Sequence, residues 1–122
     1  MPGGRNLTGP WGEALAAEYL RRKRYEILAC NFRSRYGEID IIARKSEVVA
    51  FVEVKLRRSS AFAAAAEFVD RRKQERLRTT ALLWLSEHGL SLQPRFDVVE
   101  IYAPDGLATT HPQIRHMEDA FQ

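Results

Sequence analysis

The sequence of 122 residues lacks several features each of which would by itself identify a class of protein. It has a single cysteine, Cys30, which excludes an intrachain disulfide and a zinc site built from cysteines. Its longest apolar runs, at 48–52 and 81–85, fall far below the roughly 20 residues that span a bilayer. The first twelve residues have no apolar stretch long enough for a signal peptide. We therefore expect a cytoplasmic protein with no membrane partner.

The sequence also lacks a Gly-rich phosphate loop, a Ser-His-Asp arrangement and a dinucleotide fingerprint. Hydrophobic residues make up 45% of the chain and charged residues 29%, which is typical of a globular domain with its own core. The length fits a single domain over 1–122, with a tail at 1–9 and a C-terminal turn and short helix at 103–122.

The net charge of +3 is unevenly distributed along the chain. From residue 95 onward, two arginines stand against five carboxylates, so the excess of positive charge lies earlier. It is concentrated at 21–24, 55–58 and 71–78. Such clusters attract a phosphate backbone, although solvated helix faces and strand ends carry them as well. Nucleic acid binding is therefore one hypothesis for this chain.

The order of apolar periodicities predicts a helix, three strands, a second helix and a fourth strand. An apolar stripe after Pro10 predicts the first helix, and Asp70 and Gly89 are suited to cap the two ends of the second. Strands are predicted over 25–33, 36–44, 47–56 and 95–102, and Cys30 is expected in the core. A last helical turn would dock Ile114, Met117 and Phe121. The class is α/β or α+β, with a mixed central β-sheet flanked by helices.

Two neighbouring predicted strands carry charged residues at alternate positions. Alternation places Glu38 and Asp40 on one face, and Glu53 and Lys55 on one face of the next strand. The short loop between the strands predicts an antiparallel hairpin, in which Asp40, Glu53 and Lys55 converge. Adjacent carboxylates repel each other unless a cation offsets their charge, and Mg²⁺ prefers such oxygen ligands. The alternative is the wet face of a sheet, with Lys55 paired to Glu53 or Glu38.

Two helical residues are candidates for the same place. Glu13 lies on the packed side of the first predicted helix, where a carboxylate needs a partner such as a metal, a lysine or backbone donors. Its alternative role is that of a first-turn glutamate favoured by the helix dipole. Lys73 lies one turn before Leu77 on the packed face of the second helix. It either reaches toward the carboxylates or is a solvated lysine near a helix start.

The residues also resemble a known family. Asp40 followed by Glu53-Val54-Lys55 is similar to the signature of the restriction-endonuclease-like superfamily, and Glu13 resembles the helix glutamate of its archaeal Holliday-junction resolvases. Strings in the order of the bacterial YraN-like family are GEALAAEYL (12–20), NFR (31–33), GEID (37–40), FVEVK (51–55), RRK (71–73), RFDVV (95–99) and AF (120–121). The chain is identified by this resemblance as a YraN-like protein with an α/β, restriction-endonuclease-like fold.

The resemblance implies metal-dependent cleavage of a DNA phosphodiester by an endonuclease, with branched DNA as one candidate substrate. Asp40, Glu53 and the carbonyl of Val54 would hold one or two Mg²⁺ (or Mn²⁺) ions, and Glu13 would complete the site or hold a metal-bound water. Lys55 would orient the attacking water and stabilise the charge that develops on the phosphate. The basic residues expected to contact DNA are Arg57, Arg58, Arg71, Arg72 and Lys73.

Two other functions remain open from the sequence. The chain could be a non-catalytic DNA-binding or accessory protein that keeps the nuclease fold. Alternatively, its charged residues could form an internal network of salt bridges without a ligand. The sequence also leaves open whether the protein is a homodimer.

Overall fold

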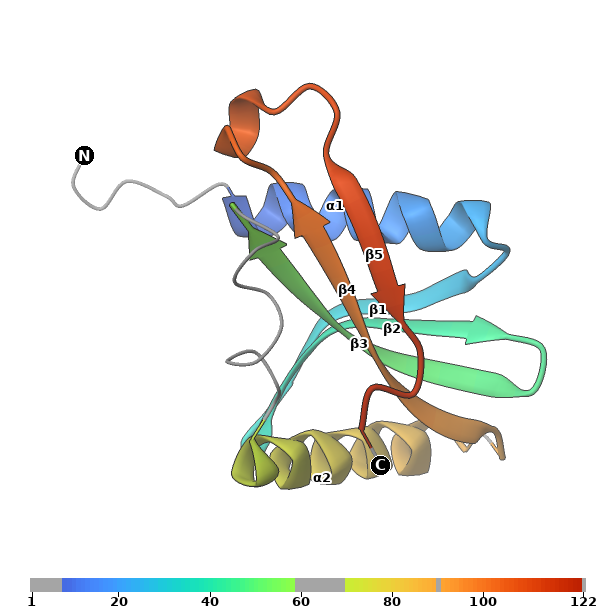
Figure 1. Ribbon diagram of the computed structural model, residues 1–122. Helices are drawn as coiled ribbons and strands as arrows, with labels where there is room; N and C mark the ends of the chain where they lie inside the picture. Colours follow the sequence, from blue (N-terminus) through green and yellow to red (C-terminus); the bar gives the residue numbers. More distant parts are fainter. Residues whose placement is uncertain (1–7, 59–69, 90, 122) are drawn as a thin grey trace.

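A mixed five-stranded sheet forms the centre of the protein, with one helix on each of its faces (Figure 1). The computed structural model describes residues 8–58, 70–89 and 91–121. The elements, in chain order, are α1 (Thr8–Arg22), β1 (Glu26–Ser34), β2 (Gly37–Lys45), β3 (Val48–Arg57), α2 (Arg71–His88), β4 (Gln93–Tyr102), the 3₁₀ turn η2 (Gly106–Ala108) and β5 (Gln113–Met117). The predicted α/β class and the mixed sheet flanked by helices are confirmed.

The strands lie in the sheet in their sequence order, β1-β2-β3-β4-β5. The pair β3–β4 is parallel, whereas the other three pairs are antiparallel. A parallel pair needs a crossover connection, and α2 lies in the segment between β3 and β4. The antiparallel hairpin predicted from the short loop between the second and third strands is the pair β2–β3.

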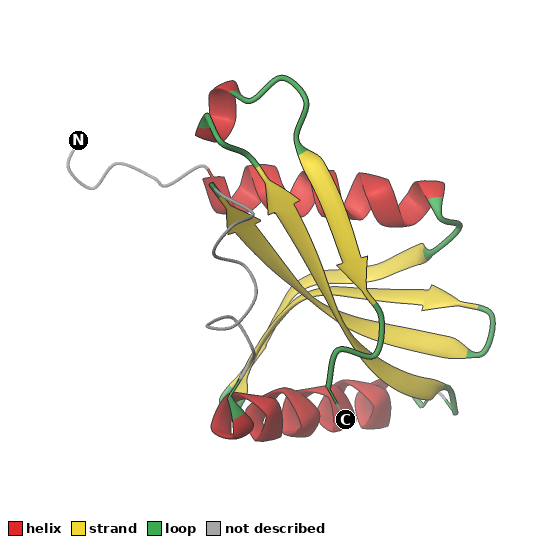
Figure 2. Ribbon diagram, in the orientation of Figure 1, coloured by secondary structure: helices red, strands yellow, loops and turns green. Residues whose placement is uncertain are grey.

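Two hydrophobic clusters hold the helices to opposite faces of the sheet, as the separation of the helices in Figure 2 shows. Ala16 and Leu20 of α1 pack on Val52 and its neighbours on one face. Leu77 and Trp84 of α2 pack on Phe51 and its neighbours on the other face. Because successive residues of a strand point to opposite faces, the run 49–52 of β3 serves both clusters at once. This explains why β3 has an uninterrupted apolar sequence.

The predicted ends of α2 are confirmed at both caps. The side chain of Asp70 accepts a hydrogen bond of 2.9 Å from the backbone N–H of Lys73, which satisfies one of the free donors of the first turn. Gly89 ends the helix with φ of 61°, a left-handed conformation that glycine adopts without a Cβ clash. Among the residues that the structure describes, no helix is long and apolar enough to cross a membrane.

Two predictions about the chain are wrong. The segment with Ile114 and Met117 is the edge strand β5 and not a helical turn, because it pairs with the free edge of β4 in the register Ile101↔Ile114. Phe121 follows it and stacks on Phe96, with 5.0 Å between the ring centroids. Cys30 is exposed and not in the core, because it lies in β1 at the other edge of the sheet, where residues 26–34 are only partly covered.

Candidate active site

The two strands that carry the predicted site residues separate at Asp40. The β2–β3 ladder runs from Lys45↔Val48 to Ile41↔Val52 and ends there. Before Ile41, β2 remains paired with β1 only, and Figure 1 shows this end of β1 and β2 bending toward the start of α2 while β3 continues toward α1. We call the place where the two strands separate, at Asp40 of β2 and Glu53 and Val54 of β3, the fork. There the backbone N–H of Val54 donates a hydrogen bond of 2.8 Å to Oδ2 of Asp40. The carboxylate thus replaces the strand partner that β3 loses.

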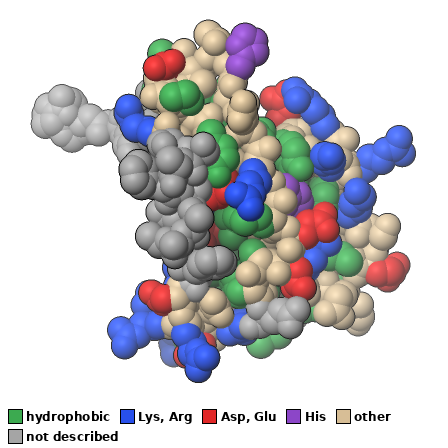
Figure 3. Space-filling model, in the orientation of Figure 1, with side chains coloured by type: hydrophobic (Ala, Val, Ile, Leu, Met, Phe, Trp, Pro, Cys, Tyr) green, Lys and Arg blue, Asp and Glu red, His purple; other side chains and the backbone are tan. Residues whose placement is uncertain are grey.

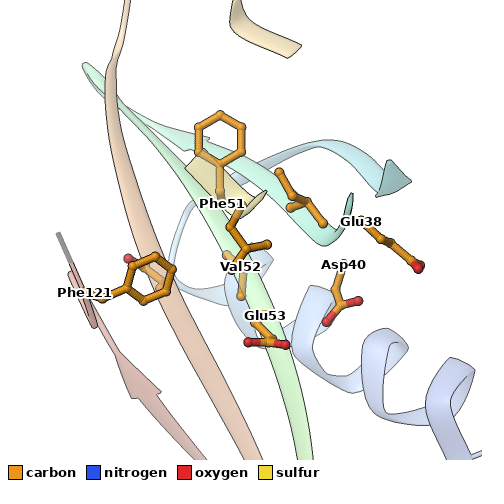
Figure 4. Close-up of a pocket in the computed structure, with 9 residues that line it drawn as sticks. Glu38, Asp40, Phe51, Val52, Glu53 and Phe121 are labelled. Atoms are coloured by element: carbon orange, nitrogen blue, oxygen red, sulfur yellow. The ribbon is translucent and has the colours of Figure 1, made fainter. Parts of the chain in front are cut away.

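The fork also breaks the simple alternation predicted for β2. Ile39 packs in the cluster of α2, whereas Ile41 packs in the cluster of α1, although alternation alone would place both on one face. The strand turns between these residues because it leaves β3 and follows β1. Consequently the side chains of Glu38 and Asp40 diverge. Figure 4 shows the carboxyl groups of Asp40 and Glu53 directed to the same side, with Glu38 pointing away from both.

Glu53 is well enclosed, with only 14% of its side chain exposed. Its Oε1 forms an ion pair with Nζ of Lys73 from α2 and lies 3.7 Å from Nζ of Lys55 on its own strand. Its Oε2 is buried and has no hydrogen-bond partner among the residues that the structure describes. Burial of a carboxylate oxygen without a donor is unfavourable. Glu53 is therefore only half satisfied by the protein around it.

The pKa of Asp40 is raised from 3.8 to about 6. Burial is the main cause, and the nearby carboxylates of Glu13, Glu53 and Glu38 add to it, while the hydrogen bond from Val54 acts in the opposite direction. The carboxylate of Glu13 on α1 is thus within electrostatic range of Asp40. The fork is therefore a region of concentrated negative charge.

A cleft of about 410 Å³ opens beside the fork. Glu38, Asp40 and Glu53 line it from the sheet, and Lys73 and Arg76 line it from α2, together with the cap residue Asp70. Glu38 therefore borders the same cleft although its carboxyl group points away from the other two. The cleft is wide enough to admit part of a charged ligand such as a phosphodiester group. A second, much smaller pocket of about 10 Å³ shares Glu38, Asp40 and Glu53 with this cleft and is closed by Asp97 and by apolar side chains such as Phe51 and Phe121 (Figure 4).

The remaining basic residues proposed for DNA binding fall into two groups. Arg58, Arg71 and Arg72 are exposed, the latter two on the first turn of α2. Figure 3 shows Lys and Arg side chains gathered at the lower left, where Figure 1 places the start of α2. Arg57 differs because its side chain is only 16% exposed and its Nε lies 3.6 Å from Oε2 of the buried Glu100. Arg57 is thus engaged inside the protein.

Sequence reasoning missed Asp97, a buried carboxylate with several hydrogen-bond donors around it. It is 1% exposed and accepts hydrogen bonds from Nε and Nη2 of Arg95 at 2.9 and 2.8 Å, and from the backbone N–H of Asp119 at 3.1 Å. Nε2 of His116 lies 2.8 Å from the same carboxylate, and Nη2 of Arg95 also donates to the hydroxyl of Tyr25 at 2.6 Å. The sequence feature that could have indicated a buried, hydrogen-bonded carboxylate is an aspartate in the largely apolar strand segment 96–101. This network ties β5 and the C-terminal segment to β4.

No three His, Cys, Asp or Glu side chains within 8–58, 70–89 and 91–121 are placed so that they could hold a metal ion together. The fork therefore offers two carboxylates, Asp40 and Glu53, and not a closed protein cage. An ion in such a place keeps several water ligands, which is the usual condition of Mg²⁺ in proteins.

Two helices on a mixed five-stranded sheet, with an acidic fork between β2 and β3, define an α/β protein consistent with the restriction-endonuclease-like fold. Residues 12–101 match the family described as "Uncharacterised protein family UPF0102", and the chain belongs to this family. The predicted YraN-like membership is thereby confirmed.

Several curated relatives are similar to the chain over nearly its whole length, each described as a "UPF0102 protein". The relative from Nocardia farcinica is 46% identical over 120 residues, which cover 98% of this chain and 92% of the relative. The relative from Syntrophomonas wolfei is 45% identical over 114 residues, covering 93% and 96% of the two chains. The relative from Geobacter sulfurreducens is 42% identical over 119 residues, covering 95% and 89%.

Proposed function

We propose that this protein is a Mg²⁺-dependent (or Mn²⁺-dependent) endonuclease of the restriction-endonuclease-like superfamily that hydrolyses phosphodiester bonds of DNA. The observation that carries the proposal is the buried Oε2 of Glu53, which has no hydrogen-bond partner among the described residues and lies beside Asp40. Two crowded carboxylates, one with an unsatisfied buried oxygen, are stabilised by a divalent cation more than by water.

The donor set fits Mg²⁺, because this ion is commonly held by one or two carboxylates and completes its shell with water and substrate phosphate. Asp40 and Glu53 would be the two carboxylates, and the carbonyl of Val54 and the carboxylate of Glu13 would complete the site. When bound there, Mg²⁺ would lower the pKa of a water molecule and offset the charge that builds on the phosphate oxygens.

The chain's own residues would do the rest of the chemistry. Lys55 would orient the attacking water and stabilise the negative phosphate through its ammonium group. Arg58, Arg71, Arg72 and Lys73 would hold the DNA backbone. The first turn of α2 has three basic residues and no acidic one, although the helix dipole disfavours cations there by about 0.3–1 kcal/mol each. An anionic ligand at this helix end would offset that cost.

A cleavage screen tests the proposal. The full chain is incubated with Mg²⁺ or Mn²⁺ and with duplex, single-stranded, flap and four-way-junction DNA, the last two because the family resemblance suggests branched substrates. Wild type should cut at least one of them, and Asp40→Asn and Glu53→Gln should not. Glu47→Gln, an exposed carboxylate at the other end of the β2–β3 hairpin, is the matched control and should cut like wild type.

One observation favours the non-catalytic alternative, a DNA-binding or accessory role for the same fold. Lys73 already forms an ion pair with Glu53, so part of the negative charge is offset without a metal. DNA binding without cleavage, together with thermal melts that are identical in EDTA and in Mg²⁺, would support this role and contradict the nuclease.

A further inference from the structure

We propose that Lys73 couples the loading of DNA to the loading of the metal. Its ammonium group holds Glu53 when the cleft is empty, and a DNA phosphate draws it away so that Glu53 becomes available to Mg²⁺. This inference rests on the proposed nuclease function and names how the same site is regulated.

The first support is the contact itself. Lys73 reaches Glu53 from α2 across the cleft, and its Nζ pairs with Oε1 only. Oε2 of the same carboxylate stays buried with no hydrogen-bond partner among the described residues. The lysine therefore neutralises Glu53 without satisfying it. A ligand that also occupies Oε2 would be bound more favourably than the ammonium group.

The second support is the charge balance of the fork. Both ammonium groups near the site, those of Lys55 and Lys73, lie against Glu53. They offset part of the negative charge of the fork and so weaken its attraction for a free divalent cation. A phosphate in the cleft adds negative charge and provides Lys73 with a second acceptor. Metal and DNA should then bind with positive cooperativity, because each removes the repulsion that the other meets.

The third support is the freedom of the Lys73 side chain. Its backbone N–H is fixed by the cap of Asp70 at 2.9 Å, so its position on α2 is set. Its side chain, however, is 43% exposed, against 25% for Lys55. A long side chain on a fixed backbone can turn from Glu53 into the adjoining cleft, which Lys73 itself lines, without moving the helix. Lys55 is more enclosed and lies on the same strand as Glu53.

The test measures metal affinity, not activity. Mn²⁺ is titrated calorimetrically into the full chain without DNA, for wild type, Lys73→Met and Arg21→Met. Lys73→Met should bind Mn²⁺ roughly tenfold more tightly than wild type, because one positive charge is removed from the carboxylate. Arg21→Met removes the same charge from an exposed position on α1 and should change the affinity less than about twofold. Lys73→Arg should resemble wild type.

A second titration is made with a short phosphorothioate duplex that resists hydrolysis. The duplex should raise the Mn²⁺ affinity of wild type, and this gain should disappear in Lys73→Met. Lys73→Gln serves as a second neutral variant if Lys73→Met does not fold. The coupling is wrong if wild type binds Mn²⁺ and cleaves DNA while both neutral variants bind Mn²⁺ no more tightly than wild type does. That result would leave the proposed nuclease function unaffected. Absence of Mn²⁺ binding by wild type and by the neutral variants would overturn both.

Discussion

Replacing Asp40 by asparagine should make the metal-free protein more stable at neutral pH. The asparagine carbonyl can still accept the hydrogen bond from the N–H of Val54, so the geometry of the fork is retained. What disappears is the negative charge, which burial and the carboxylates of Glu13, Glu53 and Glu38 make unfavourable. A charged group that destabilises its own fold is common at sites kept for binding or catalysis.

The size of the effect follows from the pKa of Asp40. A rise from 3.8 to about 6 corresponds to about 3 kcal/mol of unfavourable ionisation in the folded state. The carboxyl is partly exposed, and screening by water reduces this to on the order of 1–2 kcal/mol. Because the folded state keeps its proton longer than the unfolded state does, wild type loses stability as the pH rises from about 4 to about 6. Asp40→Asn has no such loss.

Urea denaturation in EDTA over a pH series measures this difference. The two proteins should have similar free energies of unfolding near pH 4, and the variant should be more stable by about 1–2 kcal/mol above pH 6. Addition of Mg²⁺ should stabilise only wild type, and only at the higher pH. A variant that is less stable than wild type above pH 6 would refute the reasoning, since that result means that Asp40 is held by a cationic partner within the protein.

Three further predictions concern other parts of the structure. Glu13→Gln should lower the pKa of Asp40, measured by NMR titration of its carboxyl carbon, and should weaken metal binding; an unchanged pKa would separate Glu13 from the site. Asp97→Asn should cost about 3–5 kcal/mol in urea denaturation without changing metal affinity in the folded protein. Burial alone would raise the pKa of Asp97, but hydrogen bonds from His116 and Arg95 hold this pKa below its usual value. The ionised Asp97 therefore stabilises the folded protein, and this stabilisation should be lost as the pH falls through the lowered pKa. Reversing the charge of Arg71 and Arg72 should weaken binding to all DNA sequences alike and reduce the slope of log affinity against log salt by about one unit per lost contact; an unchanged slope would contradict their role.

Much of the architecture could be predicted from local patterns in the sequence. The three strands 26–34, 37–45 and 48–57 lie within one residue of the predicted segments at each end, because their alternation and short loops act over neighbouring residues. Asp70 and Gly89 define both ends of α2 through hydrogen bonding and backbone conformation at single positions. The convergence of Asp40 with Glu53 followed from the register of one hairpin.

The tertiary structure decided what depends on residues that are distant in sequence. The segment 113–117 is a strand because it forms hydrogen bonds with the edge of β4. The spacing of Ile114 and Met117 alone could not predict that this edge would be available. The pairing of Lys73 with Glu53 arises only when α2 packs against the far face of the sheet from α1. The sequence by itself thus determined which residues are candidates for the chemistry and on which elements they lie. Where β2 leaves β3, and hence how deeply Asp40 and Glu53 are buried and how strongly their charges interact, was settled by packing over long range.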